Sequence, residues 1–178
     1  MAPFADYVTI NISSPNTPGL RTLQDPEQLM RILSVLKELQ HVHQNQEHKY
    51  VPIVVKIAPD LDRQELHEVA RCLMSHQVDG IIATNTTTTR PQHVQMAHLN
   101  ERGGLSGQPL QALSTLVIQT LREYVGTQIP IIGCGGILSA QDALEKFAAG
   151  ASLIQLYTGF VYQGPQLIRD IHADLSLH

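Results

Sequence analysis

Short apolar runs rich in β-branched residues alternate along this chain with longer segments in which apolar residues recur every three or four positions. Such runs predict β-strands, and such segments predict amphipathic helices. The predicted strands are residues 6–12, 51–57, 78–84, 129–132 and 152–157. Strict alternation of strand and helix is typical of an α/β protein with a parallel sheet, so we expect that class of fold.

Capping residues mark the starts of the predicted helices. Asp25 precedes Pro26, a residue suited to the first helical position, and Asp62 and Glu65 form a capping-box pattern. An apolar stripe follows Asp25 and fades into the polar residues 40–49. The stripe consists of Leu29, Met30, Ile32, Leu33, Val35, Leu36 and Leu39. Further helices are expected from Pro109, from Ser139 and from about Pro165.

Five strands and five helices make up most of a (β/α)8 barrel, which in complete form has eight strands and about 250 residues. A chain of 178 residues can bury the core of one domain, so we expect residues 1–178 to form a single unit.

Its net charge of −4, with acidic and basic residues mixed, argues against a nucleic-acid partner. No apolar run reaches the roughly 18 residues of a membrane span, and no secretory signal is recognisable, so the chain itself is expected to be soluble.

The cysteines and histidines of the sequence indicate neither a disulfide framework nor a metal site. Cys72 and Cys134 support no disulfide framework and fit a reducing compartment. His41 and His43 lie on a polar, helix-like stretch without Cys or Asp nearby, so no metal site is expected.

Polar residues gather where the predicted strands end, which is where parallel barrels build their active sites. Residues 11–21 read Asn-Ile-Ser-Ser-Pro-Asn-Thr-Pro-Gly-Leu-Arg, a composition that suits either a plain loop or a ligand site. Residues 133–136 (Gly-Cys-Gly-Gly) and 157–159 (Tyr-Thr-Gly) follow the last two strands. Either could be a simple turn, but two such loops in this order favour a phosphate site. Residues 85–106 form a long loop, which is usually functional or disordered.

Lys56 is the one charged residue in an otherwise apolar predicted strand. Burying an ammonium group costs several kcal/mol unless it is paired or serves a purpose. A lysine pointing to water from an edge strand is the alternative. A strand flanked by helices has little water to offer, which favours a functional lysine.

Residues 11–21 resemble, almost position for position, the active-site segment of the dihydroorotate dehydrogenases, the flavin enzymes of pyrimidine biosynthesis. The resemblance runs through the rest of the chain and implies barrel strands four to eight. It also implies that the first three units, and the helices that reach the membrane surface and the quinone, are absent. Serine at position 14 implies the quinone-dependent class, located at the periphery of the cytoplasmic (inner) membrane. The implied reaction oxidises dihydroorotate to orotate, with FMN as hydride acceptor and a quinone as final acceptor.

The resemblance also assigns roles to individual residues. Ser14 corresponds to the catalytic base, and Lys56 faces the flavin, where its charge stabilises the negative charge that develops with hydride transfer. The implied FMN contacts are Asn11, Lys56, Thr84, Gly107, Gly136, Tyr157 and Thr158. The implied substrate contacts are Asn11, Asn16, Asn85 and Thr86. Primary amides both donate and accept, which suits a ring with alternating N–H and C=O groups.

Several alternatives stay open. Serine is a poor base near neutral pH and needs a partner or a water chain, for which Thr17 is the nearest candidate. Ser13 could be taken for the base instead, whereas Cys134 is not expected to be catalytic. The chain could also be a catalytically incompetent half-barrel that only partly forms the FMN and orotate site, with open edges that invite pairing. A different phosphate-binding barrel enzyme would have no reason to carry Asn-x-Ser-Ser-Pro-Asn.

Overall fold

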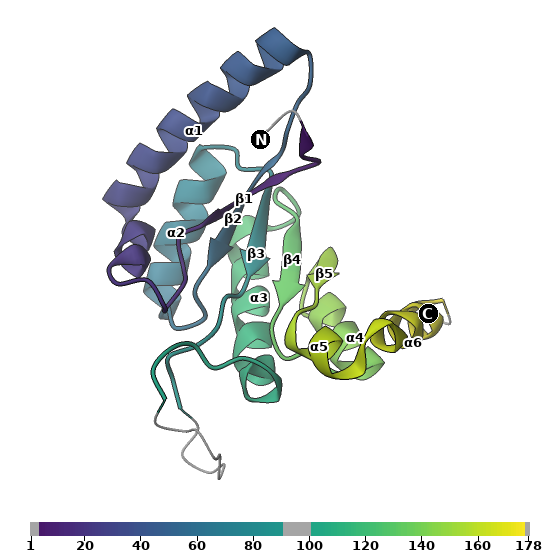
Figure 1. The fold of residues 1–178 in the computed structure, drawn as a ribbon. Helices are drawn as coiled ribbons and strands as arrows, with labels where there is room; N and C mark the ends of the chain where they lie inside the picture. Colours follow the sequence, from purple (N-terminus) through teal and green to yellow (C-terminus); the bar gives the residue numbers. More distant parts are fainter. Residues whose placement is uncertain (1–3, 91–100, 177–178) are drawn as a thin grey trace.

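Residues 4–90 and 101–176 are described by a computed structural model (Figure 1). Five strands form one sheet in the order β1-β2-β3-β4-β5, and each neighbouring pair is parallel. The strands are β1 (Val8–Asn11), β2 (Ile53–Ile57), β3 (Gly80–Ala83), β4 (Ile131–Cys134) and β5 (Leu153–Gln155). Sequential order with parallel pairing is the arrangement of successive units of a (β/α)8 barrel, so the predicted fold class is confirmed.

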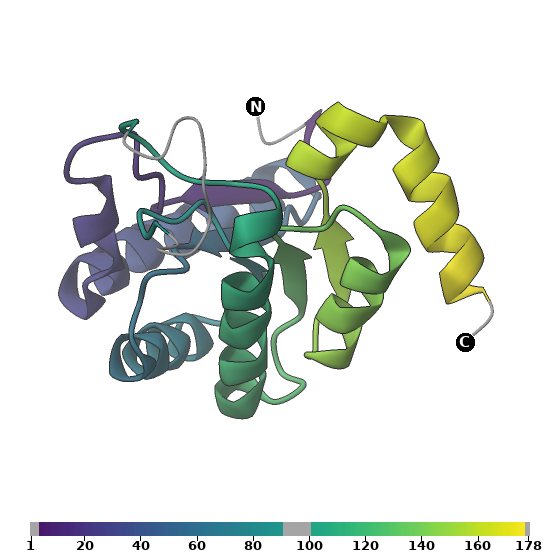
Figure 2. The same cartoon turned by 90° about the horizontal axis from the view of Figure 1, so that it is seen from below.

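Four helices join the strands and cover one side of the sheet, and two more helices follow the last strand. They are α1 (Pro26–Glu47), α2 (Arg63–Ser75), α3 (Gln111–Val125), α4 (Ala140–Ala148), α5 (Thr158–Gln163) and α6 (Pro165–Leu175), with 3-10 segments η2 (Leu20–Gln24) and η3 (Gln108–Leu110). Helix α2 packs against both α1 and α3, and α3 also contacts α4. Figure 2 shows α2, α3 and α4 together beneath the sheet. A doubly wound sheet would carry helices on both faces, so this layout is that of a barrel wall.

Local sequence explains where the helices begin. The Asp25 side chain accepts a hydrogen bond from the Glu27 backbone, and Asp62 and Glu65 form the predicted capping box. Ser139 caps α4 in the same way, accepting from the Asp142 backbone. These side chains satisfy N–H groups that the first helical turn leaves without partners, so the predicted starts are confirmed.

The two faces of the sheet bury different apolar clusters. Because side chains alternate along a strand, Val55 and Ile57 face the helices, and Val54 and Lys56 face the other side. The helix-facing cluster includes Leu33, Val55, Ile57, Leu73, Ile81, Leu121 and Ile131. The opposite cluster consists of Val54, Ile82 and Cys134, with Ile132 beside it. Lys56 therefore lies on the inner face of the barrel wall.

Helix α1 differs from its prediction. It continues through the polar residues to Glu47, because Gln40 is buried and donates to the Val51 carbonyl at 2.8 Å and to Asp79 at 3.0 Å. In the expected apolar stripe, Leu29 and Leu33 are buried, but Leu39 is 57% exposed. Met30 and Val35 are also exposed, since no described element packs over that side of α1.

The C-terminal part of the chain also differs from prediction. Strand β4 runs over Ile131–Cys134 rather than 129–132, because its pairing with β3 and β5 continues through Gly133 and Cys134. Helix α5 was not predicted; its six residues are too few to reveal a helical period. Within the predicted loop 85–106, Thr87 and Leu105 form an antiparallel bridge, and residues 91–100 lie outside the described residues.

Over the described ranges, none of the helices has the length and apolar character needed to cross a bilayer. The same residues contain no group of His, Cys, Asp or Glu arranged to hold a metal ion. Cys72 and Cys134 are buried free thiols.

Candidate active site

A cavity of about 320 Å³ lies at the C-terminal ends of β2, β3, β4 and β5. Its size falls in the range of small-molecule sites. The predicted site residues that line it are Lys56, Thr84, Asn85, Thr86, Gly107, Gly136, Tyr157 and Thr158. Four strands that are distant in sequence thus bring eight predicted residues to one cavity.

Lys56 is the single charged residue among the described residues that line this cavity. Its Nζ atom donates to Oε1 of Gln155 at 3.4 Å, and no carboxylate of the described chain lies within ion-pair distance. The edge-strand alternative is wrong, because β2 pairs with a strand on each side. The cavity therefore contains a positive charge that no nearby carboxylate neutralises.

Sequence reasoning missed Gln155 and Ser106. Gln155 ends β5 and interrupts an apolar run, which is the same signal that identified Lys56. Ser106 accepts a hydrogen bond from Thr158 at 3.0 Å and so joins the loop before η3 to the start of α5. No pattern in the local sequence singles out Ser106.

Glycine backbone forms part of the cavity wall. Gly136 has a φ of 73°, and a Cβ atom there would overlap the Cα atom of Gln111 and come within 2.5 Å of its backbone nitrogen. Gly107 has a φ of 79°, and its Cβ would lie 3.2 Å from the Thr158 side chain. Gly159 packs against the carbonyl of Ile137 in a similar way. Only glycine leaves the backbone accessible at such close approaches.

Two amides from different loops meet beside the cavity. Nδ2 of Asn85 donates to Oδ1 of Asn11 at 3.0 Å and to Oγ of Ser13 at 3.1 Å. Oδ1 of Asn85 accepts from the Thr86 backbone at 2.8 Å. Asn11 does not line the cavity itself but is joined to it through Asn85.

The two neighbouring serines have different surroundings. Ser13 is fully buried, and its hydroxyl donates to the Lys56 carbonyl at 2.6 Å. Ser14 is partly exposed, and its Oγ accepts from the Asn16 backbone at 3.3 Å. Among the described residues none accepts a hydrogen bond from Ser14, and none of the bonds joins it to Thr17. The Ser13 hydroxyl is thus committed to the backbone, whereas the Ser14 hydroxyl is available.

Asn16 connects the loop after β1 with the loop after β3. Its Oδ1 accepts from the Gly104 backbone at 3.1 Å. Ser14 and Asn16 do not line the cavity, so the structure places the two predicted substrate-side residues on a neighbouring loop rather than in the cavity wall.

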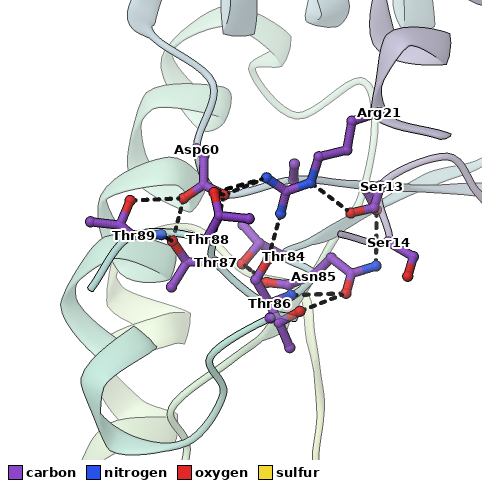
Figure 3. Close-up of polar contacts among 12 residues, drawn as sticks. Ser13, Ser14, Arg21, Asp60, Thr84, Asn85, Thr86, Thr87, Thr88 and Thr89 are labelled. Carbon is purple, nitrogen blue, oxygen red and sulfur yellow. Dashed lines mark hydrogen bonds and ion pairs between the residues drawn. The ribbon is translucent and has the colours of Figure 1, made fainter. Parts of the chain in front are cut away.

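An ion pair holds this loop in place (Figure 3). Nη1 of Arg21 lies 2.6 Å from Asp60, Nη2 donates to the Thr86 carbonyl at 2.8 Å, and Nε donates to the Ser13 carbonyl at 3.3 Å. Asp60 also accepts from the Thr87 hydroxyl and from the Thr88 backbone. One ion pair therefore connects the loops that follow β1, β2 and β3.

The surroundings of Asp60 and Cys134 shift the pKa of each side chain. Burial alone would raise the pKa of Asp60, but hydrogen bonds from Thr87 and Thr88 and the charge of Arg21 outweigh burial and lower the pKa. Burial raises the pKa of the Cys134 thiol despite the nearby charge of Lys56. A neutral thiol is a poor nucleophile, in keeping with the expectation that Cys134 is not catalytic.

Asp60→Asn is expected to lower the free energy of unfolding by about 2–4 kcal/mol at pH 7, because it leaves Arg21 partly buried without its partner. A lowered folded-state pKa contributes stability above the unfolded pKa, and that stability is lost as the pH falls through the folded value. The variant should therefore lose less stability than wild type on acidification below about pH 4. Urea unfolding across pH measures both effects.

Glu27→Gln supplies the matched control. Glu27 pairs with Arg31 at the same 2.6 Å distance, but both side chains are more than two-thirds exposed. A change within about 0.5 kcal/mol is expected there. Equal effects of the two variants would contradict a structural role for Asp60.

The sheet and its cavity define a barrel-type α/β protein with a cavity at the C-terminal strand ends. The sequence model of the dihydroorotate dehydrogenases matches residues 1–177. Relatives named dihydroorotate dehydrogenase (quinone) are 53% identical in Shewanella denitrificans, over 95% of this chain and 50% of the relative, and 55% identical in Aliivibrio salmonicida, over 94% and 50%. The chain belongs to the dihydroorotate dehydrogenase family.

Solved structures agree with this assignment. A crystal structure of DHODH from Eimeria tenella, in complex with ferulenol, superposes with a TM-score of 0.91 at 36% identity and covers 98% of this chain and 50% of that chain. A ligand-free structure from the same organism gives a TM-score of 0.90 at 38% identity. The chain spans about half the length of the relatives it matches.

Proposed function

We propose that this chain forms the FMN- and substrate-binding part of a quinone-dependent dihydroorotate dehydrogenase of pyrimidine biosynthesis. The observation that carries the proposal is one cavity at four strand ends, lined by Lys56, by the amide of Asn85 and by glycine backbone. The family and the printed names of the relatives support the reaction and the quinone acceptor. A position at the periphery of the cytoplasmic membrane is part of the same proposal.

The residues present fit FMN. Gly107 and Gly136 have positive φ values that favour glycine, and both line the cavity, so their backbone groups are accessible to a phosphate. Gly107, Gly136, Tyr157 and Thr158 would hold the phosphate end. Asn11, Lys56 and Thr84 would contact the flavin ring. When bound, FMN supplies the hydride acceptor.

Residues of this chain would supply the rest of the chemistry. Ser14 takes the proton from the substrate carbon next to the carbonyl and passes its own hydroxyl proton to water, since none of the described residues accepts a hydrogen bond from it. Lys56 places a fixed positive charge where negative charge develops. The substrate ring is bound by Asn11, Asn16, Asn85 and Thr86, whose amide and hydroxyl groups both donate and accept.

Lys56→Met is expected to lower the reduction potential of bound flavin by on the order of 30 mV or more, because the positive charge favours the reduced, more negative state. The measurement is a spectroelectrochemical titration of an FMN-loaded chimera, in which residues 1–178 replace the matching half of the Shewanella denitrificans relative. Lys37→Met is the control, since Lys37 lies on α1 and pairs with Asp79. Equal potentials in both variants would mean that Lys56 does not act on the flavin.

FMN binding by the chain tests the proposal at its first step. We expect the purified chain to quench the fluorescence of added FMN, and denaturation to release unmodified FMN. A chain that is correctly folded by circular dichroism but leaves FMN fluorescence unchanged would contradict the proposal.

The open sheet favours a second candidate, a half-barrel that binds FMN but turns over poorly. In the described chain, β1 and β5 each pair on one side only, and Leu153 and Tyr157 on and after β5 are exposed. A site without part of its wall must be ordered on binding, which costs affinity. Small misplacements of reacting groups can slow catalysis by about 100-fold.

A further inference from the structure

A second lysine, Lys146 on α4, is fully buried and packs against the glycine loop, residues 133–136. Its Nζ donates to the Gln111 carbonyl at 2.8 Å, to Oγ of Ser114 at 2.5 Å and to Oγ1 of Thr115 at 2.6 Å. These bonds use all three donors of an ammonium group. Within the described part of the chain, no carboxylate lies at ion-pair distance from it. Lys146 is thus a buried cation held by neutral oxygens alone, a costly arrangement that calls for a function.

Ser114 relays the position of Lys146 to the loop after β4. An ammonium group can only donate, so Oγ of Ser114 accepts from Lys146 and keeps its own proton to donate. That hydroxyl lies 2.9 Å from the carbonyl of Gly135 and 3.1 Å from the carbonyl of Gln111, so Gly135 offers the shorter bond. In a trans peptide the C=O and the following N–H point in opposite directions. Holding the Gly135 carbonyl on α3 therefore turns the Gly136 N–H away from α3, and both Gly135 and Gly136 line the cavity.

Close packing against Lys146 and Ser114 restricts the backbone conformation of the loop after β4. A Cβ atom on Gly133 would lie 3.2 Å from Cβ of Lys146, and one on Gly135 would lie 3.1 Å from Oγ of Ser114. The loop backbone therefore rests directly on these two side chains. A substitution of Lys146 or Ser114 would therefore act directly on the loop whose residues Gly135 and Gly136 line the cavity.

We propose that Lys146 is a positioning residue for phosphate recognition: through Ser114 it fixes the peptide between Gly135 and Gly136, so that the N–H faces the bound anion, and it places a positive charge behind that peptide. The identity of the anion, the phosphate group of FMN, rests on the proposed function. Lys146 does not line the cavity, so its effect is exerted through the loop.

The charge of Lys146 is sensitive to pH. Burial lowers its pKa to about 8, while Asp142, Cys134 and Glu145 act in the opposite direction. Asp142 and Glu145 lie on α4 and Cys134 on β4, whereas α3 contributes only neutral oxygens to its hydrogen bonds. Lys146 is therefore mostly charged at pH 7 and mostly neutral at pH 9.

Paired titrations with FMN and riboflavin test the proposal, because riboflavin has the same ring without the phosphate. We expect the 178-residue chain to prefer FMN, and Lys146→Met and Ser114→Ala to weaken FMN binding about tenfold or more while riboflavin affinity is retained. Preference for FMN in wild type should decline from pH 7 to pH 9, and Lys146→Met should lack that decline. Lys37→Met, a charge change away from the cavity, should match wild type.

Each failure has its own signature. If Lys146→Met weakens both ligands equally, the lysine has a general structural role and the inference is wrong. If wild type itself fails to prefer FMN, the phosphate assignment in the proposed function is wrong, and the inference falls with it.

A measurement without ligand tests the buried charge itself. Between pH 8 and 10.5 the unfolded chain keeps the lysine proton and the folded chain releases it, so wild type should gain stability relative to Lys146→Met. A stability difference that stays constant over this range would mean that burial does not lower the pKa of Lys146, and would overturn the expected decline in FMN preference between pH 7 and pH 9.

Discussion

Ser14→Ala is expected to slow the reduction of bound FMN by dihydroorotate about 10²–10⁴-fold, the usual contribution of a general base. Ser14 is partly exposed, and its hydroxyl is available for a substrate, because none of the described residues accepts its proton. FMN affinity should stay unchanged, since Ser14 does not line the cavity. Anaerobic stopped-flow measurements on the chimera would report both values.

Ser13→Ala is the matched control, and its effect should fall on stability. Its hydroxyl donates to the Lys56 carbonyl at 2.6 Å and accepts from the Asn85 amide at 3.1 Å, so the variant removes two partly buried hydrogen bonds. A loss of about 1–3 kcal/mol in unfolding free energy is expected, with flavin reduction slowed much less than in Ser14→Ala. Equal rates in the two variants would refute the assignment of Ser14 as the base.

Gly136→Ala is expected to weaken FMN binding by at least about 100-fold. The new Cβ would overlap the backbone of Gln111, and the φ of 73° is strained for alanine, so the loop must move away from the phosphate. Equilibrium titration of FMN fluorescence measures the loss.

Gly19→Ala separates the two causes of that loss. Gly19 has the same φ of 73°, but no atom lies within 4 Å of a Cβ built there. It should cost about 1 kcal/mol of stability and leave FMN affinity near that of wild type. Wild-type affinity in Gly136→Ala would place the phosphate elsewhere.

Local sequence was sufficient to predict the features that depend on neighbouring residues. The caps at Asp25, Asp62 and Ser139 act within one helical turn, so their chemistry is visible in the sequence. The alternation of strand and helix likewise predicted the parallel sheet. Lys56 stood out because a charge interrupts an apolar strand, and the structure places it in the cavity.

Features that depend on long-range contacts could not be predicted this way. Helix α1 outlasts its apolar stripe because Gln40 bonds to Val51 and Asp79, which no local pattern reveals. Arg21 belongs to the recognised segment, but its partner Asp60 lies 39 residues away. The choice between Ser13 and Ser14 likewise depends on which hydroxyl meets the Lys56 carbonyl.

Some residues of the candidate site could be predicted from the sequence, and others could not. The resemblance named eight residues that line the cavity but missed Gln155 and Ser106, which also line it. Lys146 lies behind the cavity wall and was missed too; all three are hydrogen-bonded to residues on other elements. Lys146 in particular lies on an ordinary amphipathic helix, and only its burial sets it apart. The roles of all these residues, and the numbering of the strands as four to eight of a barrel, stay predictions.

Anaerobic addition of dihydroorotate to the FMN-loaded chimera tests most directly whether residues 1–178 carry the proposed active site. Rapid bleaching of the oxidised flavin, with formation of orotate and return of the colour on adding a soluble quinone, is the expected result. The 178-residue chain alone should bleach at least about 100-fold more slowly, because both edges of its sheet, β1 and β5, are open. A chimera that folds and binds FMN but does not bleach would contradict the assignment of the active site to this chain.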